Sequence, residues 1–150
     1  MQKLEELTPP ELLALHAAVS DELRRRGVTR SSNNPVGDLA EHLFWRAFDW
    51  NQAPDSMRDA DATDDAQLRY QIKGRRVTAR NGSRQLGGLR NLPARRFDFL
   101  AAVLFQENYR VQRAALILHA LVLDLAKRQA VEDGWSNIKC DVRRSQQASP

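Results

Sequence analysis

Apolar residues return at helical spacing in two stretches near the start of the chain. Between residues 12 and 23, leucine and valine recur every three or four positions and form one narrow apolar side. Between residues 36 and 47 the apolar side is wider, so a helix here is expected to be buried along it. Thr8-Pro9-Pro10-Glu11 is typical of a capping box, and Asn34-Pro35 of a helix start. The pattern therefore predicts a helical arm over residues 1–27 and a second helix from residue 34.

The stretch from Arg69 to Arg76 alternates apolar and polar positions in the manner of a strand. Tyr70 and Ile72 take one face, and the arginine, glutamine and lysine side chains between them take the other. Residues 57–63 predict a short strand before it, with a turn at 64–67. In such a hairpin, side chains on opposed strands come close enough to converge on one ion.

Two largely apolar runs, residues 97–105 and 109–118, flank polar turn residues at 106–108. Apolar runs of this kind are typical of strands covered on both faces, so both are expected in the centre of a sheet. Residues 121–130 predict a last helix, and residues 134–142 an edge strand. A short helix is expected at 85–91, inside a basic loop that contains glycine.

The order helix, helix, hairpin, short helix, hairpin, helix predicts an α/β (α+β) fold with a mixed β-sheet flanked by helices. A chain of 150 residues fits one domain with its own core. We expect the arm at 1–27, a main domain at 34–142 after a polar linker, and a flexible tail at 143–150.

The chain is basic, and the positions of the charges are more informative than their total. The net charge of +4 indicates nucleic acid only weakly. Residues 68–96 hold nine basic side chains and no acidic one, directly after a group of aspartates that begins at Asp49. This order suits a metal ion bound beside a polyphosphate, and a solvated charged surface is the alternative.

Other classes of function find little support in the residues present. The single cysteine, Cys140, rules out a disulfide within the chain and a zinc site made of four cysteines. The histidines show no zinc-ligand spacing with it, and no phosphate-binding glycine loop or nucleophile elbow occurs. With no apolar run of membrane-spanning length and no signal-peptide core, we expect a soluble cytoplasmic protein with no membrane partner.

The aspartates and the alternating strand together offer the ligands of a hydrolytic metal site. Such a site needs carboxylates for a hard cation, further oxygen ligands, and a cation that orients the attacking water. The groups expected to supply these are the carboxylates of Asp61 and Glu41, the Gln71 amide oxygen, the Ile72 carbonyl and the Lys73 ammonium. Asp61 ranks first among the aspartates because it lies symmetric to Gln71 about the turn, and Asp59 and Asp55 follow.

Asp61, then Gln71-Ile72-Lys73, preceded by a helix bearing Glu41, resembles the core of the PD-(D/E)XK nuclease superfamily, the restriction-endonuclease-like fold. The resemblance covers residues 34 to about 126. It implies an endonuclease that hydrolyses DNA with Mg²⁺ or Mn²⁺, in restriction or phage defence. Asp61, Glu41, Gln71 and Ile72 would then bind the metal, and Lys73 would orient or activate the water. Gln71 stands where the family usually has Glu or Asp, as it also does in Mrr-like nucleases, and a neutral amide binds a hard cation more weakly.

Side chains of the basic stretch are expected to contact DNA through its phosphates. They are Arg69, Arg75, Arg76, Arg80, Ser83, Arg84, Gln85 and Arg90. Two other interpretations stay open. One is a catalytically inactive DNA-binding protein on the same fold, in which Gln71 reflects a decayed metal site. The other is an interaction protein whose arm forms a homodimer and which binds no nucleic acid.

Overall fold

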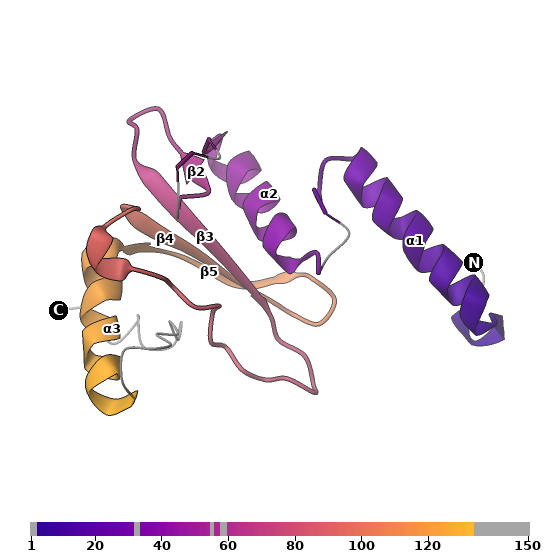
Figure 1. Cartoon of the computed structure of the whole chain (residues 1–150). Coiled ribbons are helices and arrows are strands. Elements are labelled where there is room, and N and C mark those ends of the chain that lie inside the picture. Colours follow the sequence, from indigo (N-terminus) through magenta and orange to yellow (C-terminus); the bar gives the residue numbers. More distant parts are fainter. Residues whose placement is uncertain (1–2, 32–33, 55, 58–59, 134–150) are drawn as a thin grey trace.

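The computed structural model describes residues 3–31, 34–54, 56–57 and 60–133, which form a mixed α+β fold around a five-stranded sheet (Figure 1). The strands are β1 Asn51–Gln52, β2 Ala62–Thr63, β3 Arg69–Arg76, β4 Phe99–Phe105 and β5 Val111–Leu118. The helices are α1 Pro9–Arg25, α2 Val36–Phe48 and α3 His119–Asp133, with short 3-10 helices η1 Leu4–Glu6 and η2 Leu92–Ala94. The expected α+β class is therefore confirmed.

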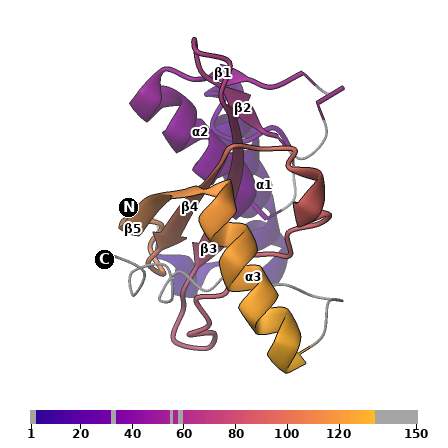
Figure 2. The same ribbon diagram turned by 90° about the vertical axis from the view of Figure 1, so that its left-hand side faces the viewer.

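The described strands follow one another across the sheet in chain order. β2 with β3 and β4 with β5 form the two antiparallel hairpins that the sequence predicts. β3 and β4 run parallel, so the chain between them must return to the start of the sheet. Residues 77–98 make this crossover along an irregular path, on the face of the sheet that α3 also covers (Figure 2).

Each face of the sheet has its own hydrophobic core. On one face α2 places Ala40 and Phe44 against Tyr70 and Ile72 of β3. Gly74 permits this close approach, because a Cβ there would lie 2.9 Å from the Ala40 Cβ. On the other face, leucines of the crossover and one side of α3 cover β4. The buried residues of that core are Leu86, Leu89, Leu92, Phe97, Leu100, Ala102, Leu104, Ile117, Val122 and Ala126.

α1 forms where the sequence predicts it but packs on little of the domain. The expected capping box is present, and the backbone N–H of Thr8 donates to a carboxylate oxygen of Glu11 at 2.8 Å. No residue of α1 is buried. Figure 1 shows the helix projecting away from the sheet, joined to α2 by the linker.

The short helix expected at residues 85–91 does not form. Within the crossover the helical turn is η2, further along the chain. Gly87 and Gly88 disfavour a helix at the expected place, and Leu86 and Leu89 enter the core from an irregular backbone instead.

β5 is the last strand of the described sheet and not the central strand that its apolar run suggests. Ile117 faces the α3 side and is buried. Leu116 and Leu118 lie on the α2 side and stay exposed, because α2 packs mainly over β3. The edge strand expected at 134–142 and the tail at 143–150 lie outside the described residues, as do Asp55 and Asp59.

Candidate functional site

Asp61 directly precedes β2 and lies beside β3, just past the last pair of the β2–β3 ladder. Its backbone N–H donates to the Tyr70 carbonyl at 2.8 Å, next to the last pair of the β2–β3 ladder, Ala62 with Tyr70. Its carboxylate oxygen Oδ2 accepts the Ile72 N–H at 2.7 Å. The carboxylate thus accepts a backbone N–H of β3 that lies beyond the β2–β3 pairs. Backbone groups alternate in direction along a strand, so the Ile72 carbonyl faces this same edge.

Glu41 approaches Asp61 from α2. The contact between Ala40 and Gly74 sets the helix close on β3, and Glu41 is the next residue along. Its side chain is only 15% exposed. Burial, and then the negative charge of Asp61, raise the pKa of Glu41 to about 7, while Arg30 opposes the rise. The two carboxylates that the sequence singles out are therefore electrostatically coupled.

Arg30 is a member of this site that the sequence does not reveal. Its guanidinium forms an ion pair with Glu41, lies 3.9 Å from Asp38 and stands over the Trp45 ring at 5.3 Å from the ring centroid. The Arg30 backbone N–H also donates to Asp38 at 2.9 Å, which ties the linker to α2. Arg30 lies in an irregular segment, so no periodicity relates it to Glu41. Only the folded path of the linker brings the two together.

Gln71 and Lys73 lie on the sheet face away from α2. Gln71 pairs with Leu100 and Lys73 with Ala102, and both partners belong to the α3-side core. Gln71 is buried, with 7% exposure, and Lys73 is half-buried. The side chains of Gln71 and Lys73 therefore lie on one face of β3, near the edge that holds Asp61. Glu41 approaches that edge from the other face.

The groups at this edge offer oxygen atoms to a cation. Among the described residues, no group of three or more His, Cys, Asp or Glu side chains gathers in one place. The set consists of two carboxylates, the Gln71 amide and the Ile72 carbonyl, all oxygen donors of the kind that Mg²⁺ and Mn²⁺ prefer. A divalent cation would also relieve the repulsion that contributes to the raised pKa of Glu41. The donor types thus suit such an ion, while Gln71 lies on the opposite face of the sheet from Glu41.

Arg69 and Arg76, both expected to contact DNA, have partners within the sheet and its turn. Arg69 forms an ion pair with Asp98 at 3.2 Å and lowers the pKa of that carboxyl, which fastens β3 to the start of β4. Arg76 donates to the Glu107 carbonyl at 2.8 Å, and its guanidinium lies 4.4 Å from the centroid of the Tyr109 ring. Both arginines therefore help to hold the sheet and its turn.

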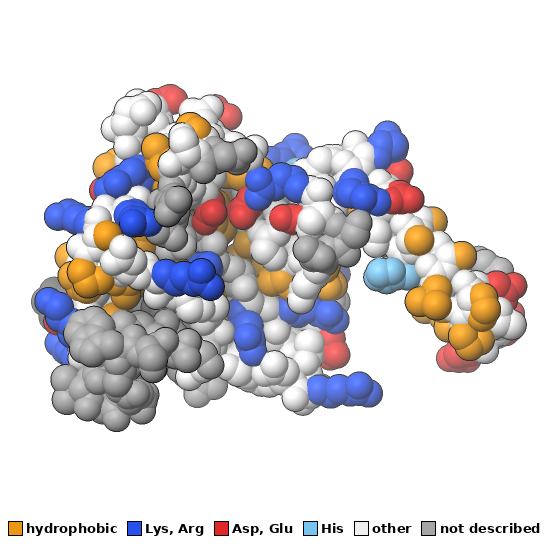
Figure 3. Space-filling model, viewed as in Figure 1, with side chains coloured by type: hydrophobic (Ala, Val, Ile, Leu, Met, Phe, Trp, Pro, Cys, Tyr) orange, Lys and Arg blue, Asp and Glu red, His pale blue; other side chains and the backbone are white. Residues whose placement is uncertain are grey.

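The remaining residues of that set belong to the crossover or contact it. Arg75 donates to the Ser83 carbonyl at 3.3 Å, and the Ser83 hydroxyl accepts the Gln85 N–H at 3.3 Å. Arg80 and Arg90 are exposed, and Arg84 is half-buried. In Figure 3 acidic side chains gather over the region of α2 and β3, with lysines and arginines on both sides.

Comparisons with known proteins add no family. No protein-family model matches the chain, and a search of curated proteins found no similar sequence. Among the described helices, none is long and apolar enough to cross a membrane.

Proposed function

We propose that this protein is an endonuclease that hydrolyses DNA phosphodiester bonds with Mg²⁺ or Mn²⁺, on a restriction-endonuclease-like arrangement. The observation that carries the proposal is the Asp61 carboxylate, which is fixed on the Ile72 N–H at 2.7 Å and coupled to Glu41. The element order supports it: a helix with Glu41, the β2–β3 hairpin, a crossover to the parallel β4, and then β5 and α3.

Different residues of the chain would perform the separate steps of such a reaction. Asp61, Glu41, the Gln71 amide and the Ile72 carbonyl would hold the cation. A bound divalent cation would polarise the phosphate and favour ionisation of water. The Lys73 ammonium would orient the attacking water and stabilise negative charge as it develops on the phosphate oxygens. Exposed arginines of the crossover, such as Arg80 and Arg90, would contact the flanking phosphates.

Cleavage of supercoiled plasmid and of linear duplex DNA, each with Mg²⁺ or Mn²⁺, tests this proposal. Asp61→Asn and Lys73→Ala should each lower the cleavage rate by about a hundredfold or more, since each removes a charged group from the site. Lys127→Ala is the matched control, because it removes an exposed lysine of α3 and should leave cleavage unchanged. Cleavage that survives in both site variants would refute the assignment.

A second function is favoured by the neutral Gln71 and by the Arg30–Glu41 ion pair. Both lower the demand for a bound cation, as in a DNA-binding protein that has lost catalysis. If this alternative holds, the affinity for DNA should fall steeply as the salt concentration rises, and neither ion should support cleavage. Gln71→Glu tests the metal site under either function, because an added carboxylate there should strengthen Mn²⁺ binding, measured by calorimetry, even where the parent chain does not cleave.

A further inference from the structure

α1 carries an apolar side that the rest of the described chain leaves largely uncovered. We call Leu12, Leu15, Val19 and Leu23 the arm stripe. Leu12 is 38% exposed, Leu15 40% and Val19 52%. A helix of this length has little stability of its own in water, and most helices in proteins are stabilised by packing of their apolar side. The arm stripe therefore calls for an additional partner.

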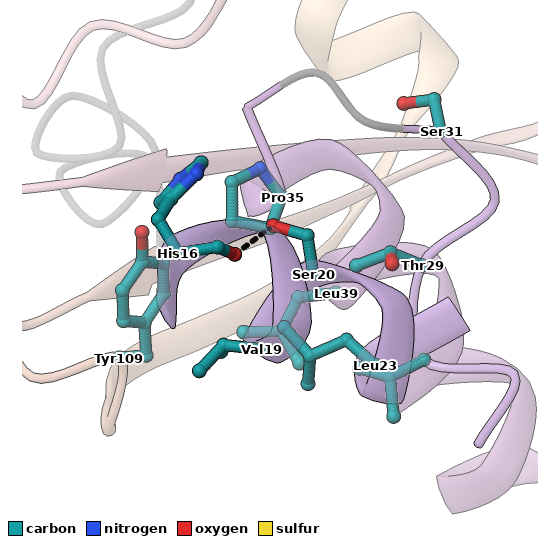
Figure 4. Close-up of a pocket in the computed structure, with 10 residues that line it drawn as sticks. His16, Val19, Ser20, Leu23, Thr29, Ser31, Pro35, Leu39 and Tyr109 are labelled. Atoms are coloured by element: carbon teal, nitrogen blue, oxygen red, sulfur yellow. Dashed lines mark hydrogen bonds between the residues drawn. The ribbon is translucent and has the colours of Figure 1, made fainter. Parts of the chain in front are cut away.

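The domain covers only one end of the arm stripe. A groove of about 400 Å³ lies between α1 and the domain, and Val19 and Leu23 contribute to its wall beside Leu39 (Figure 4). Tyr109, from the turn before β5, closes it near His16. Leu12 and Leu15 lie outside the groove, and Val19, 52% exposed, still presents its side chain to another molecule.

The charges along the arm indicate which molecule this is. Three acidic side chains, Glu5, Glu6 and Glu11, lie at its start beside one basic side chain, Lys3. Three arginines at 24–26 lie at its end and form ion pairs with Asp21 and Glu22, which leaves one net positive charge there. Two arms that run antiparallel would set the acidic start of each beside the basic end of the other, and would also oppose their helix dipoles favourably. Parallel arms would bring like charges together.

We propose that two copies of this chain associate through antiparallel packing of their α1 helices. The arm stripe spans about 17 Å from Leu12 to Leu23 at 1.5 Å per residue, and a two-fold axis near its middle would set Leu12 against Leu23 of the second copy. The surface is self-complementary, as an interface between identical copies requires. A contact of three turns is small for a stable complex, so the dissociation constant is expected in the micromolar range.

Sedimentation velocity tests the association at concentrations from about 1 µM to about 300 µM, with EDTA and without DNA. These conditions keep the result independent of any nuclease activity. The chain should pass from monomer to dimer over this range. Leu12→Glu should raise the dissociation constant about tenfold or more, because it places a charge within the packed helices.

Leu13→Glu is the matched control, since it makes the same change in the next residue of the same helix. Leu13 is 70% exposed and lies about 100° around the helix from Leu12, off the arm stripe. It should leave the dissociation constant within about twofold of the parent value. Far-UV circular dichroism checks that both variants keep their helices. A chain that stays monomeric throughout, or equal loss of association in both variants, would overturn the proposal.

Disulfide trapping tests the orientation, in a chain whose one cysteine is removed by Cys140→Ser. A mixture of Leu12→Cys and Leu23→Cys chains should form a mixed disulfide, because antiparallel packing sets these positions face to face. Leu12→Cys alone should cross-link poorly. Efficient cross-linking of Leu12→Cys with itself would indicate parallel arms and refute the antiparallel arrangement.

Discussion

α1 and α2 are both amphipathic helices that the hydrophobic pattern predicts, yet only α2 packs its apolar side against the sheet. α2 buries Ala40 and Phe44 against β3 and brings Glu41 to the candidate site. α1 buries none of its residues. The wider apolar stripe of α2 meets a sheet, whereas the narrower stripe of α1 meets only a groove at one end. Helical periodicity thus predicts that a helix forms, but not what covers it.

The comparison is tested most strongly by truncating one apolar side chain on each helix. Phe44→Ala should lower the free energy of unfolding by about 3–5 kcal/mol, because it leaves a cavity between α2 and β3. Leu13→Ala on α1 should change it by less than about 0.5 kcal/mol, since that side chain is exposed. Chemical denaturation of both variants measures the difference. Similar losses would show that α1 is as well packed as α2.

The partly buried carboxyl group of Glu41 on α2 gives the second test of the comparison between the two helices. The raised pKa of Glu41 means that the folded state holds its proton more tightly than the unfolded state, whose pKa is near 4.5. Its contribution to stability is therefore most favourable below pH 4.5 and is lost as the pH rises to about 7. Glu41→Gln removes this loss, so in EDTA it should stabilise the protein by on the order of 3 kcal/mol at alkaline pH.

Thermal unfolding of the parent chain and of Glu41→Gln across this pH range measures that effect. Below pH 4.5 the two should unfold alike, because the parent carboxyl is then protonated in both states. Glu11→Gln on α1 is the comparison, since Glu11 has a lowered pKa and is fully exposed. It should give no gain at alkaline pH. A Glu41 effect that is the same at every pH would contradict its raised pKa.

The close approach of α2 to β3 gives a smaller effect. Gly74→Ala puts a Cβ 2.9 Å from the Ala40 Cβ and 3.1 Å from the Val36 carbonyl oxygen, so α2 must shift away from the strand. We expect a loss of about 1–3 kcal/mol. Gly37→Ala, within α2, is the control, because a Cβ there would meet nothing within 4 Å. Equal stability of the two variants in denaturant would show that the contact is not tight.

The cap of α1 gives the smallest effect on the whole domain. Thr8→Ala removes the hydroxyl of the capping box and should cost the helix about 1 kcal/mol. Since α1 packs on little else, this cost should be seen in faster amide exchange along the arm, while the melting of the sheet changes little. Hydrogen exchange with mass spectrometry separates the two. Loss of protection throughout the sheet would show that the arm and domain unfold together.

Much of the fold could be predicted from the sequence, because its signals are local. The capping box at Thr8 and Glu11, the alternation along β3 and the turn after β4 each depend on a few neighbouring residues. The crossover could not be predicted in the same way. Leu86 and Leu89 are buried by long-range packing, and the two glycines between them remove the helix that a short apolar pattern suggested.

For the candidate site, the sequence by itself determined the functional groups: the Glu41 and Asp61 carboxylates, the Gln71 amide, the Ile72 carbonyl and the Lys73 ammonium. Position in a hairpin and on a helix was enough to single them out. Only the tertiary structure decided their environment, because burial and charge coupling depend on residues far apart in the chain. It set Asp61 on the Ile72 N–H, brought Arg30 of the linker onto Glu41, and placed Gln71 and Lys73 on the other face of β3.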